Sequence, residues 1–180
     1  MLTGCSGVPL RSLPRLINLQ EDLLKFDPGE FKFAVQTDAA NTPPKGSLPT
    51  LDLYLRPARE GAFEPYQSKI PMQLDVVDIA PGLASAPPSR RWLIFSFGPQ
   101  AQAELLAFQQ RMKRRVAEKA STGGGSLSVG ISQEGLAADD LRLSRTRWES
   151  WLQTDRKTGF FELWSGTIAE LKALSRKRTE

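Results

Sequence analysis

The sequence contains no histidine and a single cysteine, Cys5. Without histidine, the chain lacks the usual general base near neutral pH and the commonest metal ligand in proteins. Ser-His-Asp and Cys-His nucleophilic sites are therefore excluded, and one cysteine can form neither an internal disulfide nor an ordinary zinc site. Catalysis would have to use carboxylates, lysine, serine or tyrosine, and we expect neither a metal nor a cofactor.

The sequence also lacks long hydrophobic runs and nucleotide-binding loops. No apolar stretch approaches the roughly 18 residues that span a bilayer. The glycines at 123–125 follow an expected helix and carry no neighbouring lysine, so they predict a turn and not a phosphate loop. Hydrophobic residues make up 40% of the chain and charged residues 24%, which is typical of a globular domain. A chain of 180 residues is long enough to bury a sizeable core.

Positive charge is concentrated in the second half of the chain. Residues 1–90 carry 9 basic and 10 acidic side chains, and residues 91–180 carry 15 and 10, so the halves have net charges of −1 and +5. A basic half of this size is compatible with anionic lipid, nucleic acid, an acidic protein or simply a solvated surface.

Alternating apolar and polar residues predict about seven strands, and one segment has helical periodicity. Leu105, Phe108, Met112 and Val116 follow the helical period after Pro99, which suits the first position of a helix. The pattern predicts an α+β fold, a mainly antiparallel sheet or sandwich with this amphipathic helix packed on it and short helices at both ends. The expected strands are 31–37, 51–56, 68–79, 91–97, 126–132, 147–153 and 159–164.

Two short segments have the signature of a capping box, an N-cap residue with glutamate three positions later. Asn18 and Glu21 predict a helix that ends near Phe26, and Thr167 and Glu170 predict a C-terminal helix. Pro71, within the third expected strand, indicates an edge strand or a bulge.

The first residues, Leu2-Thr3-Gly4-Cys5, match the lipobox that precedes the lipidated cysteine of bacterial lipoproteins. We expect acylation of Cys5, although a free thiol without a role and an accidental match are the alternatives. Only three residues precede Gly4, fewer than a signal peptide needs. The interpretation divides the chain into a lipobox and tether at 1–14 and one α+β domain at 15–180.

These features together resemble a family of small, uncharacterised bacterial envelope lipoproteins. The resemblance is carried by the lipobox, the short tether, the order of strands and helix, the stretch Gly-Ser-Leu-Ser-Val-Gly at 125–130 and the late aromatic hairpin. It implies a location and a fold, and no activity. Ser6 after the cysteine implies the outer membrane, with the domain facing the periplasm.

Two groups of side chains are candidates for contact with a partner. Trp148, Trp151 and Phe160 belong to an aromatic concentration in the expected hairpin, where one face is core and the other could be exposed. Arg114 and Arg115 lie in the basic last turns of the long helix, where they could bind phosphate groups or simply be solvated. The alternative for the aromatic residues is that both faces of the hairpin are buried under helices or loops, and this needs no partner.

The functional hypothesis is a lipid-anchored bacterial envelope protein without catalytic activity, attached to the membrane through Cys5. It would bind a protein or a lipid in envelope assembly or secretion. The alternatives are a soluble basic module that binds nucleic acid, and an enzyme using carboxylates such as Glu134, Asp139 and Asp140. Adjacent carboxylates usually point apart, and the aromatic residues match no RNA-stacking motif, so both alternatives have less support.

Overall fold

The computed structural model describes residues 19, 22–60, 62–75, 81–117 and 124–177. Cys5 and the expected tether at 1–14 lie outside the described residues. The strands are β1 (Lys32–Asp38), β2 (Thr50–Pro57), β3 (Tyr66–Pro71), β4 (Gln73–Leu74), β5 (Arg90–Ser96), β6 (Gly125–Ser132), β7 (Arg147–Gln153) and β8 (Phe161–Thr167). The helices are α2 (Pro99–Ala117) and α4 (Ile168–Lys177), with the 3-10 turns η2 (Glu134–Leu136) and η3 (Leu141–Leu143).

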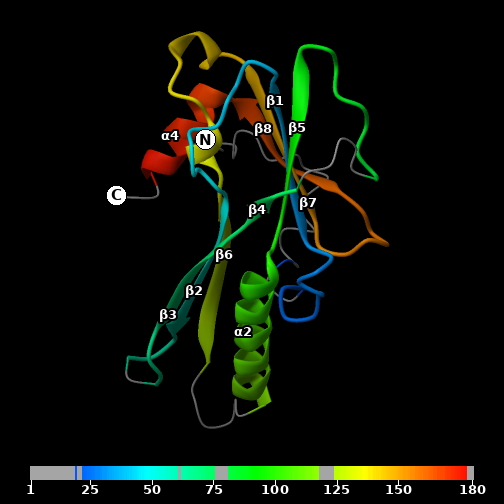
Figure 1. Ribbon diagram of the computed structural model, residues 1–180. Helices are drawn as coiled ribbons and strands as arrows, with labels where there is room; N and C mark the ends of the chain where they lie inside the picture. Colours follow the sequence, from blue (N-terminus) through cyan, green and yellow to red (C-terminus); the bar gives the residue numbers. More distant parts are fainter. Residues whose placement is uncertain (1–18, 20–21, 61, 76–80, 118–123, 178–180) are drawn as a thin grey trace, which may run out of the picture.

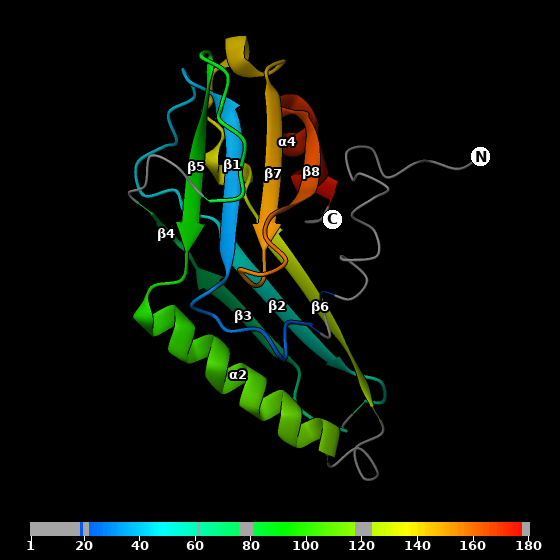
Figure 2. The same ribbon diagram turned by 90° about the vertical axis from the view of Figure 1, so that its right-hand side faces the viewer.

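The strands form two antiparallel sheets, which confirms the α+β prediction. The five-stranded sheet has the order β4-β5-β1-β7-β8, and the three-stranded sheet has the order β3-β2-β6. The five-stranded sheet occupies one end of an elongated molecule, and α2 lies along the three-stranded sheet at the other end (Figure 1, Figure 2). Among the described residues, no helix is both long and apolar enough to cross a membrane.

One hydrophobic core joins the two sheets and both helices. Phe33 and Phe95 enter it from the five-stranded sheet, Leu53 from the three-stranded sheet, and Leu105 and Phe108 from α2, and all five are almost fully buried. The helix therefore packs on the sheet with the face that its periodicity predicts. The Tyr66 ring of β3 stacks on that of Phe108 with centroids 5.3 Å apart.

Strand β1 differs from its sequence pattern, because both of its faces are covered. Its alternation predicts that Gln36 faces solvent, but Gln36 is 6% exposed and Ala34 is fully buried. Since β1 lies between β5 and β7, only its two faces could reach solvent. Both are occupied, one by the main core and the other by a smaller cluster described below.

The prediction of one continuous strand at 68–79 is wrong. Residues up to Pro71 form β3 at the edge of the three-stranded sheet, whereas Gln73 and Leu74 form β4 at the edge of the other sheet. The chain changes sheets at Met72, whose buried side chain lies in the common core. Leu74, which alternation places inside, is 51% exposed. Pro71 stands at an edge, as its missing N–H requires.

The two expected terminal helices have different outcomes. At the start of α4, Thr167 Oγ1 accepts the Glu170 backbone N–H at 3.2 Å and Glu170 Oε2 accepts the Thr167 backbone N–H at 2.7 Å, which confirms the second capping box. For the N-terminal helix, Asn18 and Glu21 lie outside the described residues. Leu19, Leu23 and Phe26 are buried, as expected.

Candidate binding surface on the five-stranded sheet

The face of the five-stranded sheet that points away from the main core carries a second, smaller hydrophobic cluster. Its buried centre is Ala34 of β1 and Ile94 of β5. Partly buried side chains pack against that centre and form what we call the aromatic patch, namely Trp92 of β5, Trp151 of β7 and, from two loops, Leu83 and Phe160. The patch is half-exposed and lies on the sheet, not inside the fold.

Strand register brings the two tryptophans of the patch together. Ala34 is paired with Ile94 on β5 and with Trp151 on β7, and Gln36 is paired with Trp92. Because alanine at the central strand is small, the indole rings can meet across it. Their centroids are 6.4 Å apart at an interplanar angle of 78°, the edge-to-face arrangement that aromatic rings prefer.

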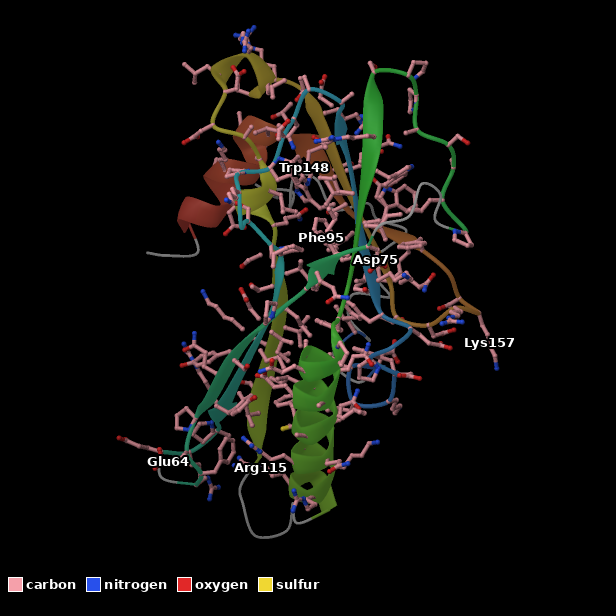
Figure 3. The ribbon with its side chains drawn as sticks, in the orientation of Figure 1. Glu64, Asp75, Phe95, Arg115, Trp148 and Lys157 are labelled. Atoms are coloured by element: carbon pink, nitrogen blue, oxygen red, sulfur yellow. The ribbon has the colours of Figure 1, made fainter. Side chains whose placement is uncertain are left out.

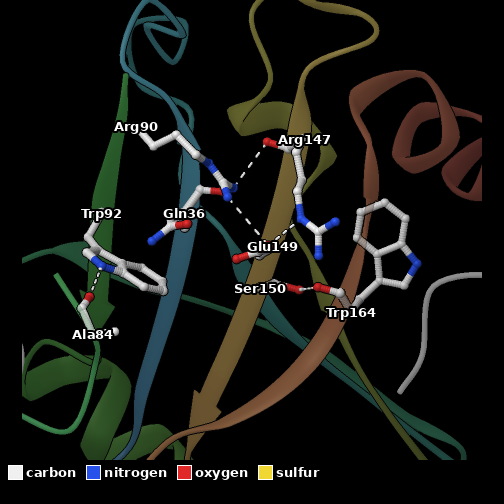
Figure 4. A network of polar contacts seen from close by, with 8 residues as sticks. All are labelled: Gln36, Ala84, Arg90, Trp92, Arg147, Glu149, Ser150 and Trp164. Carbon is white, nitrogen blue, oxygen red and sulfur yellow. Dashed lines mark hydrogen bonds and ion pairs between the residues drawn. The ribbon is translucent and has the colours of Figure 1, made fainter. Parts of the chain in front are cut away.

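The two indole N–H groups have different partners. Trp92 Nε1 donates to the Ala84 backbone carbonyl at 2.9 Å, which holds the loop after β4 against the sheet (Figure 4). Trp151 Nε1 is buried and has no hydrogen-bond partner in the described part of the chain. An indole donor of this kind usually finds an acceptor when it is buried, so the patch contains an unmet donor.

A charged network borders one end of the patch (Figure 4). Arg90 Nη2 donates to the Gln36 backbone carbonyl at 2.8 Å and to that of Arg147 at 3.3 Å. Glu149 accepts from the Arg147 guanidinium and lies 3.4 Å from Arg90 Nη1. One carboxylate thus serves two guanidinium groups, and this end of the patch keeps a net positive charge.

A second polar group borders the opposite end. Lys32 Nζ lies 2.6 Å from Asp75 Oδ2, and the Ser96 hydroxyl donates to the other oxygen of Asp75. Lys32 and Ser96 are paired residues of β1 and β5, so the sheet fixes both. With charged groups at both ends and apolar rings between them, the face has an apolar centre and a polar rim.

The structure separates the predicted hairpin aromatics into two groups. Trp151 and Phe160 belong to the patch, but Trp148 points to the opposite face and is 0% exposed. Its Nε1 donates to Gln133 Oε1 at 2.9 Å inside the core. The prediction that Trp148 contacts a partner is therefore wrong. Its neighbour Trp164 is also a core residue.

Sequence reasoning did not assign Trp92 and Leu83 to the same surface as Trp151. The alternation around β5 does place Trp92 opposite the core face. Its meeting with a residue almost sixty positions later depends on β5 and β7 flanking β1. Leu83 belongs to a loop without periodicity, and no local signal could have identified it.

The basic end of α2 lies far from the patch, and two of its arginines make contacts with aromatic rings of the same chain. Figure 3 shows Arg115 at the end of the molecule opposite Trp148. The Arg115 guanidinium lies 4.3 Å from the centre of the Phe63 ring, and that of Arg111 lies 4.9 Å from the centre of the Tyr66 ring. Arg115 is half-buried, and this cation–π contact is an intramolecular role for it. Arg114 is exposed, as predicted.

The carboxylates considered for acid–base work are held by separate partners. Asp140 accepts from the Arg142 backbone N–H at 2.9 Å and pairs with its guanidinium at 2.7 Å. These contacts, the side-chain hydrogen bond first, lower the pKa of Asp140. Asp139 lies 2.8 Å from Lys172 Nζ. Within the described ranges, no three acidic or cysteine side chains are grouped to hold a metal ion.

Comparison of the chain with models of protein families, with curated protein sequences and with solved structures finds no match.

Proposed function

We propose that this protein is a lipid-anchored bacterial envelope protein, held to the membrane through Cys5, whose domain binds another protein through the aromatic patch. The observation that carries the binding proposal is the composition of the sheet face. Half-exposed tryptophan and phenylalanine side chains occupy its centre, and charged groups border them. The anchor rests on the lipobox-like Leu2-Thr3-Gly4-Cys5.

The makeup of the patch favours a protein partner over a lipid. Tryptophan and arginine are enriched at the centres of protein interfaces, and hot spots are buried aromatics surrounded by polar groups. An acyl chain would need an apolar path. Here Arg90 and Glu149 at one end, and Lys32 and Asp75 at the other, would have to lose solvent without gaining partners.

The indole N–H of Trp151, which has no acceptor among the described residues, also favours a protein partner. The Trp151 Nε1–H can donate to a carbonyl or carboxylate oxygen of a partner, provided that binding moves aside the atoms that cover this buried nitrogen, and a protein surface supplies both kinds of oxygen. A hydrogen bond made in a desolvated apolar setting also contributes to specificity, because a partner without the acceptor leaves the donor unsatisfied.

The anchor is tested by metabolic labelling with a fatty-acid analogue in cells carrying the native gene. We expect incorporation that is lost in Cys5→Ala, while Cys5→Ala protein with unchanged thermal unfolding controls for misfolding. Label that persists in Cys5→Ala, or no label in the wild type, overturns the anchor. Lipid chains contribute about 0.8 kcal/mol per buried CH₂, so the labelled form should fractionate with membranes.

The patch is tested in the same cells by placing a photo-crosslinking amino acid at position 160. The matched control is position 141, since Leu141 is 91% exposed and lies outside the patch. We expect a discrete protein adduct from position 160 only. Adducts with lipid alone would favour a lipid ligand, and equal or absent adducts at both positions would overturn the proposal. Steeply salt-dependent binding of an oligonucleotide would instead favour the nucleic-acid alternative.

A further inference from the structure

Strand β6 lies at the edge of the three-stranded sheet and lacks the features that normally protect an edge. Its eight residues, Gly-Ser-Leu-Ser-Val-Gly-Ile-Ser, contain no charged residue and no proline. Its pairing with β2 runs through eight consecutive residue pairs without a register shift. Natural edge strands usually carry charges, prolines or bulges, or are very short, because free N–H and C=O groups attract another strand.

Two of the three other edges of the sheets, β3 and β4, have such protection. Strand β3, at the opposite edge of the same sheet, carries Lys69 and ends in Pro71. Strand β4, at one edge of the five-stranded sheet, has two residues. Against these, β6 is long, regular and uncharged.

The register identifies the backbone groups at the free edge. The Ala58 N–H donates to the Gly124 carbonyl at 3.1 Å, so Ala58 and Gly124 form a hydrogen-bonded pair that continues the β2–β6 ladder. In an antiparallel ladder such pairs alternate with non-bonded ones. The N–H and C=O groups of Leu127, Val129 and Ile131 therefore point away from β2. No strand of the described chain lies on that side.

The side chains of these three residues share one face as well. Leu127, Val129 and Ile131 pack against the main core and stay only partly buried. The residues between them are serine and glycine. An added strand with apolar residues at alternate positions would cover the part of this apolar row that solvent still reaches.

We infer that a second copy of this chain supplies that strand, with β6 pairing antiparallel to β6 around a two-fold axis at Val129. In this register Val129 faces Val129, and Leu127 faces Ile131 of the other copy. The residues with outward backbone groups are the same residues that carry the apolar side chains. The added strand would therefore form its backbone hydrogen bonds and cover the apolar side chains in the same register.

The self-pairing has no electrostatic cost within the strand, because β6 carries no charge. Three facing pairs would form about six backbone hydrogen bonds, two for each pair. The product is one continuous sheet of six strands with the order β3-β2-β6-β6-β2-β3, an isologous contact of the kind that closes at a dimer. The aromatic patch belongs to the other sheet, so this inference goes beyond the proposed function and does not depend on it.

The first experiment measures the mass of the Cys5→Ala chain by light scattering at about 100 μM, a concentration chosen to detect a weak dimer. We expect twice the chain mass of 19.9 kDa. Val129→Pro should give the monomer mass, because it removes an outward N–H while the ladder to β2, made by the alternate residues, stays intact. Val129→Thr keeps the N–H and should remain dimeric. A monomeric parent, or a dimeric Val129→Pro, overturns the pairing.

A crosslinking experiment decides the matter if Val129→Pro fails to fold. In the Cys5→Ala background, Val129→Cys should form a disulfide-linked dimer under mild oxidation. Facing residues have Cα atoms about 5.5 Å apart, within disulfide range. Ser126→Cys is the control, since the two copies of residue 126 would lie about 20 Å apart, six residues along the strands. No linkage at 129, or equal linkage at 126, overturns the register.

Discussion

Replacing Trp148 with phenylalanine should destabilise the domain far more than the same replacement at Trp92. Trp148 is 0% exposed, whereas Trp92 is half-exposed in the aromatic patch. Both indoles donate one hydrogen bond, to Gln133 Oε1 at 2.9 Å and to the Ala84 carbonyl at 2.9 Å. The pair of variants therefore holds the chemistry constant and changes the burial.

The magnitude for Trp148→Phe follows from two costs. The smaller ring leaves part of the indole volume empty in a packed core, where large-to-small changes are expensive. The substitution also leaves Gln133 Oε1 without its donor, in a side chain that is 7% exposed. An unsatisfied buried acceptor costs about 1–3 kcal/mol. Together we expect a loss of about 2–4 kcal/mol in the free energy of unfolding, against less than about 1 kcal/mol for Trp92→Phe.

The assay is urea unfolding followed by far-ultraviolet circular dichroism, with the double variant Trp148→Phe, Gln133→Met completing a cycle. Methionine removes the unsatisfied acceptor, so Trp148→Phe should cost about 1 kcal/mol less in that background. Ser150 still has the Trp164 carbonyl, 3.4 Å away, as a partner when Gln133 is replaced. A Trp148→Phe loss below about 0.5 kcal/mol, or no coupling in the cycle, would refute the reasoning.

Three further predictions test packing, capping and loop attachment. Gly125→Ala should lower the free energy of unfolding by about 1–3 kcal/mol, because the new Cβ would lie 2.6 Å from a β2 carbonyl oxygen. At the control position, the Cβ of Gly135→Ala meets nothing within 4 Å, so thermal unfolding should show a change of less than about 0.5 kcal/mol. Hydrogen bonds from the Thr167 backbone N–H and then from its hydroxyl lower the pKa of Glu170 below the ordinary 4.5. Glu170→Gln should therefore reduce the urea midpoint at pH 7. The difference in midpoint between wild type and variant should shrink as the pH falls through the lowered pKa of Glu170. Asn41→Ala should lose about 2 kcal/mol in urea unfolding, since the buried amide contacts two backbone groups after β6 at 3.3 and 2.8 Å; a loss below about 0.5 kcal/mol would contradict this role.

The parts of the fold that the sequence predicts well have local causes. Helix α2 begins at Pro99 and buries Leu105 and Phe108, as its period requires. The hairpin of β7 and β8 joins neighbouring segments, and the cap of α4 depends on two residues three positions apart. Each of these signals is complete within one helix, one helix cap or one pair of neighbouring strands. These elements can therefore be predicted without knowing which distant segments pack against them.

The parts that the sequence missed depend on which strands become neighbours. Alternation continues through Ile70 and Met72, but it cannot show that the chain leaves one sheet there and joins the other. It also divides the hairpin into two faces without saying which face meets the core, so the sequence predicts a contact role for Trp148, which belongs to the interior. The aromatic patch requires β5 and β7 to flank β1, a long-range arrangement with no local signal.

The arrangement of the two sheets makes the proposed anchor, partner surface and self-pairing edge separable. The patch is built on β5, β1 and β7, whereas the pairing edge is β6 of the other sheet. Changes at sites that share no contacts usually have additive effects. Val129→Pro should therefore abolish the dimer and leave crosslinking at position 160 intact, and a substitution in the patch should leave the dimer mass unchanged. If Val129→Pro also removed the partner adduct, the partner would require the dimer, and the two surfaces would have to be treated as one site.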